Sequence, residues 1–275
     1  MRISRIRAVV AAGAGALVVA AGLVVGAGSA AAAPSYVALG DSYSSGVGTR
    51  EYIDDGTNCM RSNYAYPKLD ADRLGASLSF QACSGARTND VLSNQLGTLN
   101  SGTSYVTISV GGNDAGFADV ITQCAKPWPY TCTSQIANAQ SFIRNTLPGL
   151  LDNVYNQIHA KAPNARVVVL GYPRLFNGET CNLLARISSQ EEADLNTTAD
   201  ILATTTSGRA AAHGFGFVDS RGAFTGHAIC DDVEWLNGLS NPISESYHPN
   251  RSGQQAFANL VQGVLTSGVA APSAA

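Results

Sequence analysis

The stretch YVALGDSYSSGVG, residues 36–48, decides the fold that the rest of the chain must complete. It begins with an apolar run, residues 36–39, and then changes abruptly to Gly40, Asp41 and Ser42. A short continuous apolar run indicates a strand that is buried on both faces, as in a parallel sheet. The stretch predicts a reactive serine at the exposed end of a buried strand. The alternative is an ordinary loop rich in serine and glycine.

Similar apolar runs recur along the chain, with helical patterns between them. The runs span residues 78–82, 105–110, 166–170 and 215–218. Apolar residues at three- and four-residue spacing predict a helix over residues 136–159, bent near Pro148, and further helices over residues 188–213 and 250–266. Alternating strands and helices predict an open, doubly wound α/β sheet.

Two long segments are expected to be loops. Residues 115–133 are rich in proline and hold Trp128 and Tyr130 between two cysteines. Residues 220–249 show no clear periodicity. Long loops without regular structure in compact domains are usually functional.

The N-terminus has the composition of an export signal. Three arginines precede an apolar run over residues 8–27, and alanines at 30–33 provide a cleavage site. We therefore expect a secretory signal peptide over residues 1–33, with a membrane anchor as the alternative. A single domain is expected over residues 34–267, followed by a frayed tail over residues 268–275. These features predict a secreted, extracellular protein.

The charge balance disfavours a polyanionic partner. The chain has 17 basic and 20 acidic residues, and removal of the three N-terminal arginines leaves 14 − 20 = −6. No run of lysine or arginine is present. We therefore expect no binding to nucleic acid.

Six cysteines suggest three disulfides in an exported chain. Six cysteines allow fifteen pairings, of which we expect the sequential one. A metal site is disfavoured because no Cys-x-x-Cys spacing occurs. The expected pairs are Cys59–Cys83, Cys124–Cys132 and Cys181–Cys230.

Four strand ends offer the groups that acyl transfer needs. Ligands of doubly wound sheets bind beyond the carboxyl ends of the strands. Ser42, Gly85 and Asn113 follow the first three predicted strands, and His248 ends the long loop after the fifth. A serine hydroxyl becomes a nucleophile when an imidazole removes its proton. The backbone N–H groups of Ser42 and Gly85 and the amide of Asn113 would stabilise the oxyanion.

The four histidines differ in their expected roles. His248 precedes Pro249, which suits the first turn of a helix, so its imidazole would face the strand ends. His159 and His213 lie near predicted helix ends, where a structural role is expected. His227 lies near a cysteine and is ambiguous.

The four blocks together resemble a known family. GDSYSSG, Gly85 in ACSGA, Asn113 in GGND, and YHP near the end resemble the GDSL esterases and lipases, also called SGNH hydrolases. The chain looks most similar to secreted streptomycete-type lipases of that family. The resemblance implies Ser42 as nucleophile, His248 as base, and Ser42, Gly85 and Asn113 as oxyanion donors. It also implies a flavodoxin-like three-layer sandwich with a five-stranded parallel sheet, and three sequential disulfides.

One position departs from the family pattern. The family places Asp three residues before the histidine, and this chain has Glu245 there. The imidazole could instead donate to a backbone carbonyl, such as that of Ser246. Only a carboxylate would also stabilise the imidazolium by charge. We favour the carbonyl, which would make the pair a dyad.

The predicted function is a secreted serine ester hydrolase that cleaves acylglycerols or related lipids through an acyl-enzyme. It would need no metal or cofactor, would act as a monomer, and could touch a lipid interface transiently through Trp128 and Tyr130. The alternatives are a phospholipase A1-type enzyme and a carbohydrate acetyl esterase on the same site, and an inert secreted binding module.

Overall fold

The computed structural model describes residues 32–126, 129–179, 181 and 187–267. Residues 1–31 of the predicted signal peptide, the predicted tail and Trp128 lie outside these residues. The described residues from Ala33 onward belong to one compact unit. Within the described ranges, no helix is both long and apolar enough to cross a bilayer.

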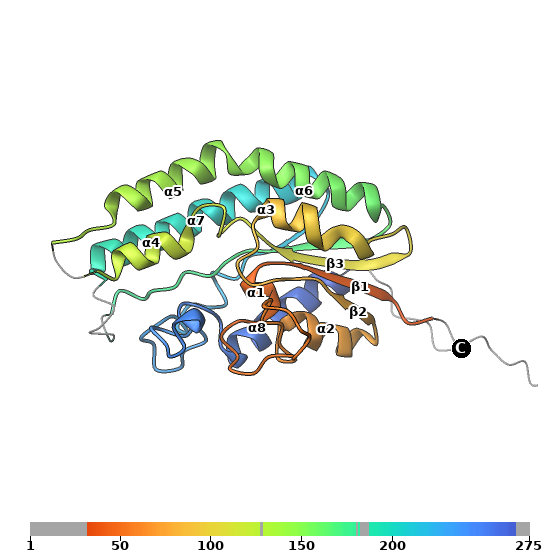
Figure 1. Cartoon of the computed structure of the whole chain (residues 1–275), viewed down its shortest axis with the longest axis horizontal. Helices are drawn as coiled ribbons and strands as arrows, with labels where there is room; N and C mark the ends of the chain where they lie inside the picture. The colour runs from red at the N-terminus through yellow and green to blue at the C-terminus, as the bar shows by residue number, and fades with distance from the viewer. Residues whose placement is uncertain (1–31, 127–128, 180, 182–186, 268–275) are drawn as a thin grey trace, which may run out of the picture. The chain divides into compact units, whose positions relative to one another are not determined.

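A five-stranded sheet forms the centre of this unit (Figure 1). All its strand pairs are parallel, in the order β2-β1-β3-β4-β5. Because β2 lies on one side of β1 and β3 on the other, the topological switch point falls between β1 and β3. The strands are β1 (Ser35–Gly40), β2 (Ser77–Phe80), β3 (Thr103–Ser109), β4 (Arg166–Leu170) and β5 (Gly216–Val218).

Strand β4 is apolar over residues 167–170 because both of its faces are buried. In β4, Val167 and Val169 pack into one hydrophobic cluster. Val168 and Leu170, which alternate with them, pack into the other. This arrangement explains why the runs do not alternate between apolar and polar residues, and the predicted α/β fold is confirmed.

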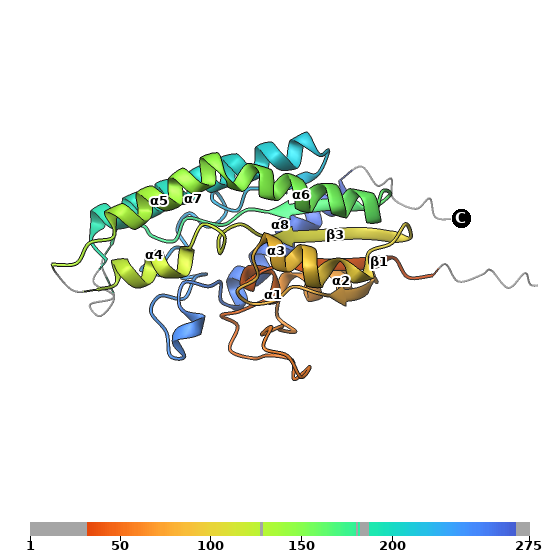
Figure 2. The ribbon, with the colours of Figure 1, turned by 45° about the horizontal axis from the view of Figure 1, so that its top comes forward.

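Helices cover both faces of the sheet. Figures 1 and 2 show α2 and α8 on one face and α5, α6 and α7 on the other. The predicted helices over residues 188–213 and 250–266 are α7 and α8. The helices are α1 (Ser42–Ser45), α2 (Tyr66–Leu74), α3 (Thr88–Asp90), α4 (Phe117–Cys124), α5 (Thr133–Asn145), α6 (Leu147–Lys161), α7 (Ser189–Ala212) and α8 (Arg251–Thr266). A π-helical turn (Val91–Gln95) and two 3₁₀ turns, η2 (Leu96–Thr98) and η3 (Ile243–Glu245), complete the set.

The prediction of one bent helix over residues 136–159 is wrong. The segment forms two helices, and Thr146 separates α5 from α6. Pro148 lies in the first turn of α6, where its missing N–H costs no intrahelical hydrogen bond. The proline therefore starts a new helix here and does not bend an existing one.

The prediction of a loop over the whole of residues 115–133 is also wrong, because α4 occupies part of it. The helix buries Val120, Ile121 and Cys124. It starts after Gly116, whose backbone φ of 77° favours glycine. The segment 220–249 behaves as expected, since its longest helical element is the three-residue η3.

Three disulfides brace the loops. They join Cys59 to Cys83, Cys124 to Cys132, and Cys181 to Cys230, which is the sequential pairing. The second one ties the end of α4 to the start of α5. Such crosslinks stabilise a fold mainly by restricting the unfolded chain.

Candidate active site

Ser42 begins α1 two residues after the end of β1, and the backbone of Gly40 at that end is held from both sides. Gly40 has a φ of 119°, and a Cβ there would lie 2.3 Å from the Ser109 carbonyl oxygen, so only glycine fits. The buried amide of Gln95 accepts from the Gly40 N–H at 2.7 Å and donates to the Gly40 carbonyl at 2.9 Å. These contacts fix where the strand ends and therefore where Ser42 stands.

The imidazole of His248 lies between Ser42 and a backbone carbonyl. Its Nε2 is 2.8 Å from Ser42 Oγ, and its Nδ1 is 2.8 Å from the Ser246 carbonyl oxygen. A carbonyl oxygen can only accept, so Nδ1 carries the proton and Nε2 accepts from the serine hydroxyl. This is the tautomer that a general base requires.

Glu245 does not contact His248. Its carboxylate is only 2% exposed and accepts from the Tyr52 hydroxyl at 2.6 Å. It also forms an ion pair with Arg50 at 2.8 Å. Of the two candidate partners of the imidazole, the Ser246 carbonyl is the one that lies beside Nδ1. Glu245 instead stabilises the loop that precedes His248.

A tyrosine joins the segments that carry the serine and the histidine. The hydroxyl of Tyr43 donates to the Tyr247 carbonyl at 2.8 Å, and the Tyr43 ring lies 5.5 Å from the His248 ring. Tyr247 has a φ of 62°, a left-handed conformation that costs free energy in a bulky residue. The Asn237 carbonyl accepts from the Tyr247 N–H at 2.9 Å. These bonds hold the strained residue before His248 in place.

The predicted oxyanion donors lie on neighbouring loops at the same sheet edge. The Asn113 amide donates to the carbonyl of Ala86, the residue after Gly85, at 3.1 Å. The Cys83 N–H donates to the Gly40 carbonyl at 3.0 Å, which ties the Gly85 loop to the end of β1. The Ser42 N–H is the first of α1 and has no partner within the helix.

Asp114 fixes these loops to each other. Its carboxylate accepts from the Thr88 hydroxyl at 2.6 Å and from the Thr88 N–H at 3.1 Å. The turn after β3 is therefore locked to the turn after β2, and the Asn113 side chain can hold a fixed position.

Burial shifts the pKa values of two groups beside Ser42. Burial lowers the pKa of His248 to about 4, although the bond to Ser246 opposes the shift. The imidazole is therefore neutral in the resting site at ordinary pH. Burial raises the pKa of Asp41 to about 6, against hydrogen bonds from Tyr172, Ser109 and Tyr43.

Asp41 and Tyr172 support the loop after β3. The Tyr172 hydroxyl donates to the Asp41 carboxylate and accepts from the Gly112 N–H at 3.4 Å. The Ser109 hydroxyl donates to Asp41 at 2.7 Å. Asp41 thus links the start of α1 to the backbone beside Asn113.

A cavity of about 370 Å³ extends from this pair. Ser42 and His248 line it together with Asn113, and its lining is mostly apolar. Small and aliphatic side chains of α4, α5 and α7 form much of its apolar wall. These residues are Val120, Ile121, Ala139, Ile143, Leu195, Ala199 and Leu202.

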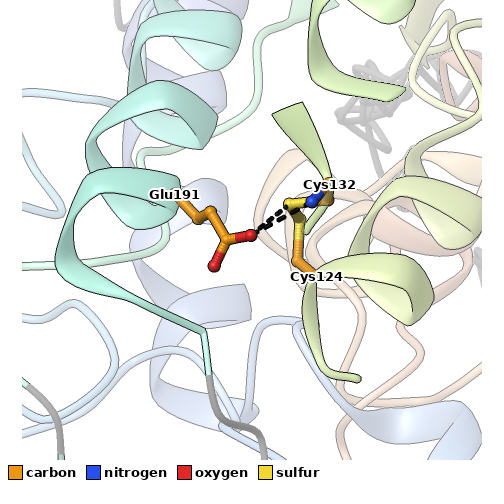
Figure 3. A group of neighbouring side chains, drawn as sticks. All are labelled: Cys124, Cys132 and Glu191. Atoms are coloured by element: carbon orange, nitrogen blue, oxygen red, sulfur yellow. Dashed lines mark hydrogen bonds between the residues drawn. A yellow bond between two sulfur atoms is a disulfide. The ribbon is translucent and has the colours of Figure 1, made fainter. Parts of the chain in front are cut away.

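One group outside the cavity has the composition of a metal site. The ligand atoms of Cys124, Cys132 and Glu191 lie within 4.8 Å of one another (Figure 3). The two sulfurs form a disulfide, so neither offers the thiolate that metals bind. A disulfide sulfur also has no hydrogen to donate. The Cys132 N–H donates to Glu191 at 3.1 Å, so Glu191 ties the disulfide to α7.

Two of the other three histidines, His213 and His227, have structural contacts. His159 lies in the last turn of α6. His213 bonds to Asp152 at 2.9 Å, and His227 bonds to a backbone carbonyl and stacks on Trp235 at a centroid distance of 3.7 Å. None of the three lines the cavity in the part of the chain that the structure describes.

Sequence reasoning assigned no role to Asp41, Tyr43, Tyr172 or the cavity walls. Asp41 and Tyr43 flank Ser42, so their position was the available signal. Tyr172 follows the fourth strand, at the edge where the other site residues were sought. The wall residues have no such signal, because apolar residues at helical spacing are also typical of a core.

Comparisons with known proteins point to one family. The model of the GDSL-like Lipase/Acylhydrolase family matches residues 38–256. The chain is 52% identical to Lipase 1 of Streptomyces coelicolor over 227 residues, covering 82% of this chain and 84% of the relative.

Two solved structures share the fold along nearly their whole length. An extracellular lipase from Streptomyces rimosus is 46% identical with a TM-score of 0.79. A phospholipase A1 from Streptomyces albidoflavus NA297 is 47% identical with a TM-score of 0.80. Each similarity covers 86% of this chain and 99% of the other.

Proposed function

The chain belongs to the GDSL-like lipase/acylhydrolase family and is a carboxylic ester hydrolase, and from this premise we propose that Ser42 is its nucleophile and His248 its general base. The observation that carries the proposal is the 2.8 Å contact between Ser42 Oγ and His248 Nε2, two residues that line an apolar cavity. A neutral imidazole within hydrogen-bond distance of a hydroxyl can remove its proton as attack begins.

The proposed reaction has two halves. Ser42 Oγ attacks the ester carbonyl, and its proton passes to His248 Nε2. The tetrahedral intermediate collapses, the bond to the alcohol breaks, and His248 protonates the departing alkoxide. A water molecule then attacks the acyl-enzyme, giving its proton to His248, which returns it to Ser42 as the carboxylic acid leaves.

The imidazolium that forms during the reaction would be stabilised by the dipole of a backbone carbonyl. The Ser246 carbonyl lies 2.8 Å from Nδ1, and Glu245 is engaged with Tyr52 and Arg50. We therefore propose a catalytic dyad in which Ser246 orients the ring and fixes its tautomer. Glu245 supports the loop that carries His248.

We propose that the oxyanion binds to the Ser42 and Gly85 N–H groups and the Asn113 amide. Asn113→Ala is expected to lower kcat roughly 10²–10³-fold with little change in KM, because the amide would bind charge that develops only in the transition state. Steady-state kinetics with p-nitrophenyl butyrate measure both constants. Asn145→Ala, at an exposed position of α5, is the matched control and should retain full activity. Unchanged kcat in the Asn113 variant would remove the residue from the oxyanion site.

We propose that the substrates are esters of long acyl chains, in acylglycerols or related lipids. The apolar wall suits an alkyl chain, whereas an acetyl group would leave it unfilled. The similarity to a phospholipase A1 makes phospholipid acyl esters the second candidate. The enzyme would meet either lipid at the surface of an aggregate.

Filling the cavity should shorten the preferred acyl chain. Ala199→Phe places a ring in the wall that α7 contributes, so kcat/KM for p-nitrophenyl palmitate is expected to fall roughly 10-fold or more. Turnover of p-nitrophenyl acetate should fall much less. Ala193→Phe, on the exposed side of the same helix, is the matched control. The same panel includes acetylated xylan, and a preference of the wild-type enzyme for that substrate would contradict the lipid assignment.

We also propose that the enzyme is secreted. Its three disulfides suit an oxidising compartment, and the similar lipase from Streptomyces rimosus is extracellular. The signal peptide over residues 1–33 and the monomeric state remain predictions from the sequence.

A further inference from the structure

The mouth of the cavity can be located from exposure. Among the described residues that line the cavity, four are also exposed to solvent, and none of the four is charged. They are Ala118, Thr122, Ile243 and Ser244. The exposed end of the cavity is therefore bordered by α4 on one side and by the turn η3 on the other.

Ile243 is the most exposed large apolar side chain among the described residues, at 70%. Transfer of an exposed isoleucine side chain from water into an apolar phase is favourable in free energy. The other exposed large apolar residues are Tyr130 and Val233, and neither lines the cavity.

The turn that presents Ile243 is tied to the body of the protein. The Arg50 guanidinium donates to the Asn241 carbonyl at 2.6 Å. On the other side of Ile243, Glu245 is buried against Tyr52, and the Ser240 N–H donates to the Ser246 hydroxyl at 2.9 Å. These bonds fix the backbone on both sides of Ile243, whose side chain is exposed to solvent.

The segment that carries Ile243 is itself uncharged, and the Arg50 guanidinium beside it is paired with Glu245. Residues 235–244, which lead into and include most of η3, contain no charged side chain. Docking this segment onto a zwitterionic lipid surface would leave no side-chain charge of its own to be desolvated. Val233 is equally apolar, but Asp232 and Glu234 flank it.

We propose that η3 is the lipid-docking element of this enzyme, with Ile243 inserting into the surface of a zwitterionic lipid aggregate beside the cavity mouth. The proposal rests on the proposed action on lipid esters. It places the entrance of the acyl cavity against the surface from which a lipid chain must leave. The docking energy comes from removing Ile243 and its uncharged neighbours from water.

The test measures binding to vesicles of diether phosphatidylcholine, which has no acyl ester to cleave. Ile243→Ser is expected to lower the vesicle partition coefficient about tenfold. Ile243→Trp is expected to raise it, because an indole is favoured at membrane interfaces. Val233→Ser, a matched loss of an exposed apolar side chain, should bind vesicles and turn over esters as the wild type does. The melting temperature of each variant verifies that it is folded.

Two outcomes would overturn the proposal. One is that vesicle binding is unchanged in both Ile243 variants. The other is that Val233→Ser weakens binding as much as Ile243→Ser, which would show a non-specific apolar effect. Because the diether lipid cannot be hydrolysed, these results are independent of the substrate panel. An enzyme that docks through Ile243 but prefers acetylated sugars would instead contradict the proposed substrate class.

Discussion

Ser42→Ala is expected to lower kcat/KM for p-nitrophenyl butyrate by roughly 10⁴-fold or more, because no other hydroxyl would replace the nucleophile. A fluorophosphonate probe should label the wild-type protein on the peptide that contains Ser42 and leave the variant unlabelled. Alanine fits the site without strain, so the variant should fold and keep its thermal stability within a few degrees.

Ser134→Ala is the matched control for this change. Ser134 is exposed on α5, and its replacement removes the same hydroxyl without touching the cavity. The control should label and turn over substrate at the wild-type level. Labelling of the folded Ser42 variant at wild-type intensity would show that another residue is the nucleophile. An unlabelled wild-type protein would favour the inert binding module.

His248→Ala is the second change with a very large expected effect. It removes the proposed acceptor of the serine proton, so kcat is expected to fall roughly 10³–10⁴-fold or more. The remaining activity should rise with pH, as hydroxide replaces the missing base. His159→Ala, in the exposed last turn of α6, is the matched control and should leave kcat unchanged. Retention of wild-type kcat in the His248 variant would contradict its role as base.

The pH profile of the wild-type enzyme provides an independent measurement of His248. Burial lowers its pKa from 6.5 to about 4, so the imidazole stays neutral as the pH falls towards 4. The acidic limb of kcat/KM is therefore expected near pH 4 and not near 6.5. A limb at or above pH 6.5 would indicate a stabilised imidazolium, as a carboxylate partner would produce.

The shifted pKa values of His248 and Asp41 have opposite effects on how the free energy of unfolding depends on pH. The folded pKa of His248 is depressed, so the unfolded chain binds more protons between about pH 4 and 6.5. Its contribution to the free energy of unfolding is present above pH 6.5 and is lost as the pH falls towards 4. The folded pKa of Asp41 is raised to about 6, so its contribution is present below pH 3.8 and is lost as the pH rises through 6. Because these contributions oppose each other, the activity profile identifies His248 more directly than unfolding does.

The fold could be predicted, and the proposed Ser42–His248 pair could be selected from the sequence, because their signals are local. β4 is the predicted run over residues 166–170, since a strand buried on both faces needs a continuous apolar sequence. Ser42 and His248 each follow a recognisable pattern, and the sheet topology brings such positions together although they lie 206 residues apart.

Other features depend on contacts that no local pattern contains. The orientation of Glu245 towards Tyr52 and Arg50 depends on a loop nearly two hundred residues away in the chain. The short helix α4 lies between a glycine and a proline-rich cysteine loop, so its few apolar residues did not stand out. The cavity arises from the spacing between α4, α5 and α7, whose residues individually look like core residues.

The hydrogen bond from Tyr43 to the Tyr247 carbonyl joins residues that lie 204 positions apart in the chain. During synthesis the serine emerges long before the histidine, and an isolated serine hydroxyl has no base to activate it. With the proposed roles of Ser42 and His248, the unfolded polypeptide is therefore expected to be unreactive towards esters. On the same proposal, activity is expected only once the loop that carries His248 packs against α1.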